Sequence, residues 1–318
     1  TPMWPVDVFV PSDVPPPVAE ALSGVFESHA DRLAAGDNAA TADVQIVPQP
    51  DSGAVVLGEW VYALVAPFPT VTDGVAWDDV WGVWQGAASG PFAGEPLLMT
   101  ADTAAALTML LGEPATGAVE IVADDQLVQY AWDTRPAWAI VPFDRLEPRW
   151  KVLQVDGVSV LDRDLDTFTY PLTVHLGMTG LSIGMDALFE AFDGQLANRD
   201  AEQISVVMMT GVTALCRCTA VMMDNQGVLY PGAEIRDWLL DADITHISNE
   251  VSFSQNCPPP ACVSTVMFCA DPQYIALIED LDIDIIELTG NHLLDWGVEA
   301  MRYSLEMYDE RQIPYFGG

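Results

Sequence analysis

The stretch DIIELTGNHLLDWG, residues 284–297, places an apolar run directly before Gly-Asn-His, with an acidic residue three positions beyond the histidine. The run 283–288 is typical of a strand buried on both faces, as parallel sheets require, and Gly290 permits a sharp turn out of it. Polar groups at the carboxyl end of such a strand lie where open α/β sheets bind ligands. The stretch therefore predicts a parallel α/β sheet with a polar strand end.

Two interpretations of His292 and Asp295 are open at this point. In the first, Asp295 caps the helix expected at about 296–308, and His292 is an ordinary loop histidine. In the second, the amide of Asn291, the imidazole of His292 and the nearby carboxylate ligate a hard metal or move protons. A motif this short does not decide between them.

The whole chain is strongly acidic. It has 318 residues, half of them apolar, which is enough for two globular domains with sizeable cores. It carries 47 acidic against 11 basic residues, for a formal charge of −36, and Lys151 is the only lysine. Such a surface repels nucleic acid and anionic lipid, so nucleic-acid binding is the function class that the composition excludes first.

We expect an extracellular or cell-surface protein. No apolar run is long enough for a membrane-spanning helix, and the opening TPMWPVDVFV suits a mature chain whose signal sequence has been removed. The five cysteines are Cys216, Cys218, Cys257, Cys262 and Cys269, and their spacing does not match a zinc ribbon. We therefore expect disulfides, with one bridge inside the Pro-rich segment 257–269 and one thiol left over.

The first half of the chain alternates strand and helix patterns. Strands at 6–10 and 42–48 flank a helix expected at 18–35, which indicates a βαβ opening with parallel pairing. Further helices are expected at 77–86 and 100–112, the second with Thr100 or Asp102 as its cap and Gly112 as its end. The tryptophans at 77, 81 and 84 share one helical face, which favours packing over a sugar-stacking platform.

A second α/β unit begins after a break. Glycines and a polar run around 177–203 predict a domain at 1–178, a linker or interdomain helix at 179–203, and a domain at 204–318. In the last of these, strands at 204–211, 244–248 and 283–289 each end in polar residues, and a further strand begins at IPYFGG. We interpret this sheet as incomplete, so that it leaves an open edge and apolar surface to be covered.

The segments ISVVMMTGVTALCR (204–217), ADITHISNEVSF (242–253) and DIIELTGNHLLDWG resemble, in order, the amino-terminal half of the CapA family. These are capsule or poly-gamma-glutamate synthesis proteins, which look like a branch of the calcineurin-type metallophosphoesterase fold. The resemblance implies a divalent metal held by Glu250 and Asn291, with His292 as general acid or phosphate-oxygen donor and Asp295 as its support. The family's first strand typically ends in Gly-Asp, whereas Val212 follows Gly211 here and cannot ligate a metal.

The first half has a weaker resemblance, carried by three segments, to periplasmic substrate-binding proteins of the phosphate type. The segments are YALVAPFPTVTDGVAWDDVWGVWQG (62–86), AWAIVPFDRLEPRWKVLQVDG (137–157) and YPLTVHLGMTG (170–180). Such folds hold oxyanions at helix amino termini. The resemblance implies a small anionic ligand near Ser12 and Asp13, before the first helix, and near the turn from Thr70 to Asp73; Ser12 as a simple helix cap is the alternative.

The expected fold class is thus α/β in two domains, one like a periplasmic binding protein and one an incomplete metallophosphoesterase-like domain. The expected function is extracellular polymer or capsule work, with metal-dependent phosphoesterase-like chemistry if the protein is an enzyme. One rival is a non-catalytic, self-assembling surface protein, as a homo-oligomer or with its carboxyl-terminal remainder still associated. The other is a solute-binding receptor acting through residues 1–178.

Overall fold

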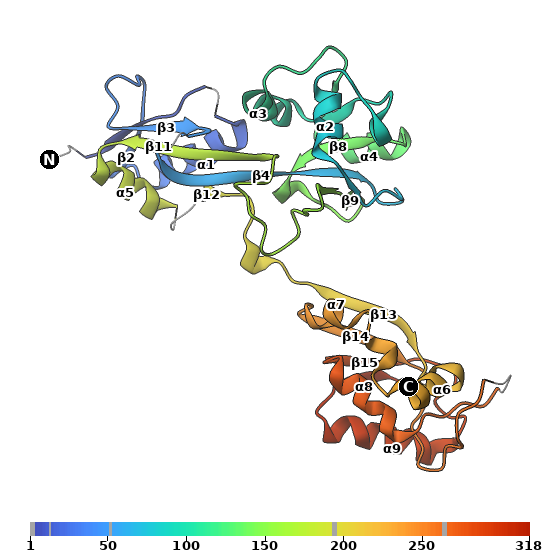
Figure 1. The fold of residues 1–318 in the computed structure, drawn as a ribbon. Helices are drawn as coiled ribbons and strands as arrows, with labels where there is room; N and C mark the ends of the chain where they lie inside the picture. The colour runs from blue at the N-terminus through green and yellow to red at the C-terminus, as the bar shows by residue number, and fades with distance from the viewer. Residues whose placement is uncertain (1–3, 13, 51–52, 193–195, 263–265) are drawn as a thin grey trace. The chain divides into compact units, whose positions relative to one another are not determined.

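The computed structural model describes residues 4–12, 14–50, 53–192, 196–262 and 266–318. The chain divides into two compact units, Thr1–Ile204 (unit 1) and Ser205–Gly318 (unit 2), each of which we describe by itself (Figure 1). The segment 179–203, for which the sequence suggests a linker, packs inside unit 1 instead. It contributes a helix and a short strand that pairs with the longest strand of that unit.

Unit 1 is a mixed α/β structure. Its strands are β1 (Val6–Phe9), β2 (Leu33–Gly36), β3 (Val44–Pro48), β4 (Val55–Pro67), β5 (Gly74–Val75), β6 (Leu97–Met99), β7 (Val119–Ile121), β8 (Trp138–Pro142), β9 (Trp150–Val152), β10 (Gln154–Val155), β11 (Thr173–Gly180) and β12 (Leu196–Ala197). Its α-helices are α1 (Pro16–Ser28), α2 (Trp77–Trp84), α3 (Ala101–Leu111), α4 (Leu127–Asp133) and α5 (Ser182–Ala191).

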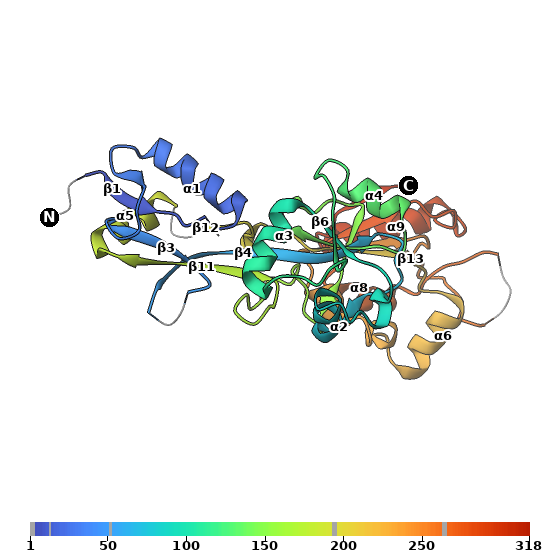
Figure 2. The same ribbon diagram turned by 90° about the horizontal axis from the view of Figure 1, so that it is seen from above.

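Strand β4 joins the two halves of unit 1, as Figures 1 and 2 both show. The strand order is β2-β1-β3-β11-β4-β8-β6-β7, with β9 and β12 also pairing with β4. The first part of β4 pairs with β11 and its second part with β8, both antiparallel. Consecutive residues 62–66 are at most 1% exposed, so both faces of this strand are covered.

The opening helix is shorter than the sequence suggests. Helix α1 ends at Ser28, and the last part of the expected helix 18–35 is instead strand β2, which pairs in parallel with β1. Leu33 lies opposite Val6 in this pairing and is 1% exposed. Burial in the sheet therefore overrides the helical pattern of the segment.

Helix α3 has the predicted cap and end, and α2 packs part of its predicted tryptophan face into the core. The hydroxyl of Thr100 accepts a hydrogen bond from the amide of Thr103, and Gly112 ends α3 with φ of 77°. Trp84 is buried and its indole donates to the carbonyl of Gly112. Trp81, in contrast, is 37% exposed, so only part of the tryptophan face packs into the core.

Unit 2 is a parallel sheet with its strands in sequence order, β13-β14-β15-β16. Its elements are β13 (Val207–Thr213), α6 (Arg217–Gln226), α7 (Arg236–Leu240), β14 (Ile244–Asn249), α8 (Ile275–Asp280), β15 (Ile285–Leu288), α9 (Gly297–Glu310) and β16 (Tyr315–Gly317). This confirms the parallel arrangement predicted from 284–297. Helix α6 was not anticipated.

The helices of unit 2 share one core on one face of its sheet. Ile247 and Ile286, on this face, are buried in a cluster with residues of all four helices. The opposite face leaves five large apolar side chains at least 46% exposed, namely Val207, Met209, Val212, Ile244 and Phe316. Parallel strands in sequence order with right-handed crossovers place every helix on the same side, which explains the uncovered face.

None of the helices in the described ranges is both long and apolar enough to cross a membrane.

Candidate functional site

The site lies where the chain leaves the carboxyl ends of β14 and β15. Beyond these strands, Val251 and His292 still form a parallel bridge, and the Ser252 hydroxyl donates to the Leu293 carbonyl over 2.6 Å. The turn comes so close that a Cβ at Gly290 would lie 1.8 Å from the Cβ of Glu250. A glycine is therefore required at 290, and the backbone of His292 is held by the neighbouring segment.

His292 and Asp295 form a hydrogen-bonded pair. The Nδ1 of His292 lies 2.7 Å from Oδ2 of Asp295, and the two side chains are 19% and 17% exposed. The same carboxylate oxygen accepts the amide of Phe268 over 2.7 Å. Asp295 therefore does not cap α9, whose N-cap residue is Trp296 without a side-chain hydrogen bond, and the simpler interpretation of Asp295 is wrong.

This pairing leaves the second ring nitrogen of His292 available. Its Nε2 makes no hydrogen bond to the described part of the chain. When Nδ1–H donates to Asp295, Nε2 of the neutral ring is an acceptor and can take a proton. A carboxylate that holds the ring in this way both orients it and stabilises the imidazolium that results.

Phe268 connects this pair to the start of α6. Its ring centroid lies 4.2 Å from that of His292, and the guanidinium of Arg217 lies 5.5 Å from the centroid of the same ring. Arg217 begins α6 with a left-handed backbone, φ 51°, a conformation that non-glycine residues adopt at a cost and that is enriched at functional sites.

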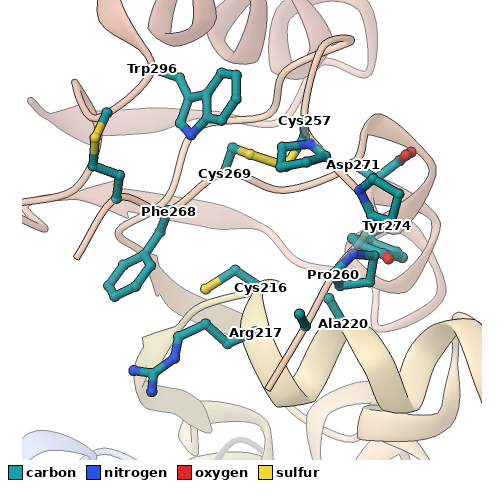
Figure 3. Close-up of a pocket in the computed structure, with 14 residues that line it drawn as sticks. Cys216, Arg217, Ala220, Cys257, Pro260, Phe268, Cys269, Asp271, Tyr274 and Trp296 are labelled. Carbon is teal, nitrogen blue, oxygen red and sulfur yellow. A yellow bond between two sulfur atoms is a disulfide. The ribbon is translucent and has the colours of Figure 1, made fainter. Parts of the chain in front are cut away.

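A cavity of about 320 Å³ opens beside these residues (Figure 3). Cys216 and Arg217 contribute to it from the start of α6, Trp296 from the start of α9, and Phe268 from the segment between. The prolines 258–260 form a further part of its wall. No pattern in the sequence indicates Phe268 or Trp296, whereas one signal for Arg217 exists, because it is the only basic residue between 200 and 235.

Unit 2 contains two disulfides, and one of them, Cys257–Cys269, lines the cavity. Cys257 is bridged to Cys269, which confirms the predicted bridge inside 257–269, and Cys218 is bridged to Cys262. Cys216 remains as the buried free thiol. Burial raises the pKa of Cys216; Arg217 opposes this rise, while the carboxylates of Glu250 and Asp295 add to it. The thiol is thus neutral at pH 7, which does not favour a nucleophilic role.

The predicted metal ligands lie at the site but do not assemble a metal centre. Glu250 is half-buried opposite Gly290, and Asn291 is exposed in the turn. Val212 is 63% exposed on β13. The described residues include no group of three or more His, Cys, Asp or Glu side chains that could hold a metal ion. The ligand roles of Glu250 and Asn291 therefore stay predictions.

The predicted ligand-binding residues of unit 1 occupy two separate loops. Ser12 lies between β1 and α1, whose N-cap is Pro15, so Ser12 is not the helix cap. Asp13 lies outside the described residues. Lys151 Nζ forms an ion pair with Asp73 over 2.5 Å and donates to the Thr70 carbonyl over 2.9 Å. This contact ties down the turn, and a ligand role for these residues stays a prediction.

Comparison with known proteins adds a family for the region that contains the site. Residues 198–318 match the bacterial capsule synthesis protein family PGA_cap. The PGA_cap match spans all of unit 2 and agrees with the CapA resemblance of the three strand ends. The His292–Asp295 pair and the cavity are therefore features of a PGA_cap-like unit. No curated protein matches the chain.

Solved structures similar to the chain include phosphate-binding proteins. They are an ABC-type phosphate transport receptor from Vibrio cholerae (11% identity, TM-score 0.46), a possible phosphate binding protein from Planctomyces limnophilus (14%, 0.45) and PstS from Borrelia burgdorferi (8%, 0.45). Each match covers 59% of this chain. It covers 93% of the Vibrio cholerae protein, 86% of the Planctomyces limnophilus protein and 91% of the Borrelia burgdorferi protein. We base no function on likeness at this level.

Proposed function

We propose that this protein acts in the synthesis or handling of an extracellular, capsule-type polymer, and that unit 2 hydrolyses or transfers a phosphoester in that process. The observation that carries the proposal is the His292–Asp295 pair at the carboxyl edge of a parallel sheet, in contact with Phe268, which lines a cavity there. The PGA_cap match over residues 198–318 supports the polymer role. Ligands in open parallel sheets bind at this edge.

The chemistry assigned to His292 is general acid–base catalysis. Its Nε2 takes a proton from water as the water oxygen attacks phosphorus, and Asp295 stabilises the imidazolium that forms. The leaving oxygen departs on the side of phosphorus opposite the attacking water, so it takes its proton from solvent water as the phosphorus–oxygen bond breaks, and the His292 imidazolium then returns its own proton to solvent. Positioned proton transfer of this kind contributes roughly 10²–10⁴-fold in rate. The metal predicted from the family resemblance is not used in any of these steps.

An extracellular location belongs to the same proposal. It is supported by the two disulfides, because such bridges persist in oxidising compartments. Self-assembly into a homo-oligomer, association with a carboxyl-terminal remainder, and solute binding by unit 1 stay predictions.

Hydrolysis of p-nitrophenyl phosphate, bis-p-nitrophenyl phosphate and p-nitrophenyl acetate by the purified chain tests the reaction, with and without added divalent ions. We expect phosphoester turnover that falls by about 10²-fold or more in His292→Ala. The control is His29→Ala, which removes a half-buried histidine from unit 1. Turnover that survives His292→Ala, or no turnover of any ester, contradicts the proposed chemistry.

A further inference from the structure

We propose that the cavity beside His292 binds a ligand with one oxyanion head and a flat apolar body, such as an aromatic phosphoester, and that the acidic polymer chain itself does not enter it. The inference rests on the proposed function, because it names the substrate class of the same site. It concerns binding, however, and is tested separately from turnover.

The walls of the cavity are apolar and preformed. Prolines 258–260 have fixed φ angles, and the Cys257–Cys269 bridge closes the loop that carries them. Tyr274 adds its ring, while its hydroxyl donates to Asp224 over 2.7 Å and is thus engaged elsewhere. Mostly apolar walls with a few polar groups are typical of small-molecule sites. These walls suit a flat apolar body and offer little to a polar one.

The positive potential at the cavity comes from Arg217 and the start of α6. Arg217 makes no hydrogen bond or ion pair to the described residues. Its guanidinium makes a cation–π contact with the ring of Phe268. The first turn of α6 has neither an acidic residue nor a side-chain cap, so its amides add to the positive potential. A cation and uncapped helix amides together favour an oxyanion.

The thiol of Cys216 supports this placement independently. Its residue is 8% exposed, it is unbridged, and it lines the cavity directly before Arg217. A neutral thiol is a weak donor that needs no strong partner when buried, and it brings no charge that would oppose an anion at this end of the cavity. Figure 3 shows the Cys216 and Arg217 side chains at the same end of the cavity.

The neighbouring carboxylates limit the head to a single anionic group. Among the lining residues described, the one acid is Asp271, which already accepts the amide of Gln273 over 2.9 Å. Burial is the main reason why the pKa of Cys216 is raised, and the charges of Glu250 and Asp295 add to the rise, so their negative potential reaches this wall. A ligand with a charge on every repeating unit meets this repulsion and that of a chain with formal charge −36.

Binding of naphthalene-2-sulfonate to the full chain, measured by isothermal titration calorimetry, tests the inference. This probe has a flat apolar body, one anionic head and no bond that the proposed reaction cleaves. We expect it to bind at least about tenfold more tightly than inorganic sulfate, which lacks the body, or 2-naphthol, which lacks the charge.

Two substitutions separate the head from the body. We expect Arg217→Gln to weaken sulfonate binding about tenfold and to leave 2-naphthol binding unchanged, since a charge-assisted contact is worth about that much. Arg217→Lys keeps the charge and is expected to stay within about threefold. Trp296→Ala, at a partly exposed ring, is expected to weaken both aromatic probes. The matched control is Arg302→Gln, an exposed arginine of α9 whose ion partner is Glu299.

Three results would overturn the inference: sulfate binding as tightly as the aromatic sulfonate, unchanged sulfonate affinity in folded Arg217→Gln, or displacement of the probe by poly-gamma-glutamate. His292→Ala keeps this inference distinct from the proposed reaction. Sulfonate binding that persists in His292→Ala supports the inference whether or not the wild-type chain hydrolyses esters. Hydrolysis that depends on His292 without selective sulfonate binding supports the reaction and rejects the inference.

Discussion

The sheets of the two units use similar apolar strands in opposite ways. Strand β4 of unit 1 is covered on both faces, and its residues 62–66 are at most 1% exposed. Strand β13 of unit 2 also contains several large apolar residues, but Val207, Met209 and Val212 are 52%, 69% and 63% exposed. The comparison teaches that apolar composition identifies a strand, whereas strand order and helix placement decide which of its faces are buried.

The largest expected effect is a difference between matched truncations in these two strands. Leu64→Ala removes a fully buried side chain from β4 and is expected to lower the free energy of unfolding by about 2–5 kcal/mol. Met209→Ala in β13 is expected to change it by less than about 0.5 kcal/mol, because the side chain is already in water. Urea denaturation of both variants measures the contrast. Equal losses would show that the open face of unit 2 is covered in solution.

The disulfides sharpen the comparison, because all five cysteines lie in unit 2. Replacing Cys257 and Cys269 together by serine is expected to destabilise unit 2 by about 3 kcal/mol, since the bridge closes a short loop. The unfolding transition of unit 1 should not move. Calorimetry with and without a reducing agent provides the measurement, and a shift of both transitions would mean that the two units unfold together.

The core of unit 2 also contains a buried polar contact, from Asn249 to Tyr308. The Asn249 amide nitrogen donates to the Tyr308 hydroxyl over 2.7 Å, at the carboxyl end of β14. Tyr308→Phe leaves that amide without its partner and is expected to lower the free energy of unfolding by about 1–3 kcal/mol. The matched control is Tyr303→Phe, a tyrosine of the same helix outside this contact. Equal stability of the two variants in urea denaturation would contradict a structural role for the contact.

The smallest expected effect is a loss of stability at alkaline pH. Burial raises the pKa of Tyr308 to about 12, with the Asn249 hydrogen bond opposing the rise. The folded state thus holds the proton more tightly than the unfolded state, whose tyrosine pKa is about 10. The stabilisation is complete below about pH 10 and is lost as the pH rises toward about 12. At about pH 11 the free energy of unfolding is lower by about 1.4 kcal/mol than below about pH 10. In Tyr308→Phe, the pH dependence of urea denaturation should be shallower by that amount.

Much of unit 2 could be predicted from its sequence because its strands are short apolar runs that end in polar residues. The run at 283–288, the Asn249-Glu250 strand end and the 257–269 bridge are all in place. The sequence analysis did not predict helix α6, because its apolar residues are mostly one consecutive run, 220–223, which shows no helical spacing, and only Ala220 and Met223 of the helix are buried. In unit 1, the segment 179–203 has the composition of a linker, yet β12 pairs with β4.

The sequence by itself determined the fold class, the order of the main elements and the motif of His292 and Asp295, because periodicity, turn residues and short spacings act over neighbouring residues. Only the tertiary structure decided what those residues contact. It turned the Asp295 carboxylate toward His292 and Phe268 instead of the start of α9. It also brought Arg217 and Trp296 to one cavity from places 79 positions apart in the printed sequence. Contacts across such separations depend on how strands pair and helices pack, which no local pattern encodes.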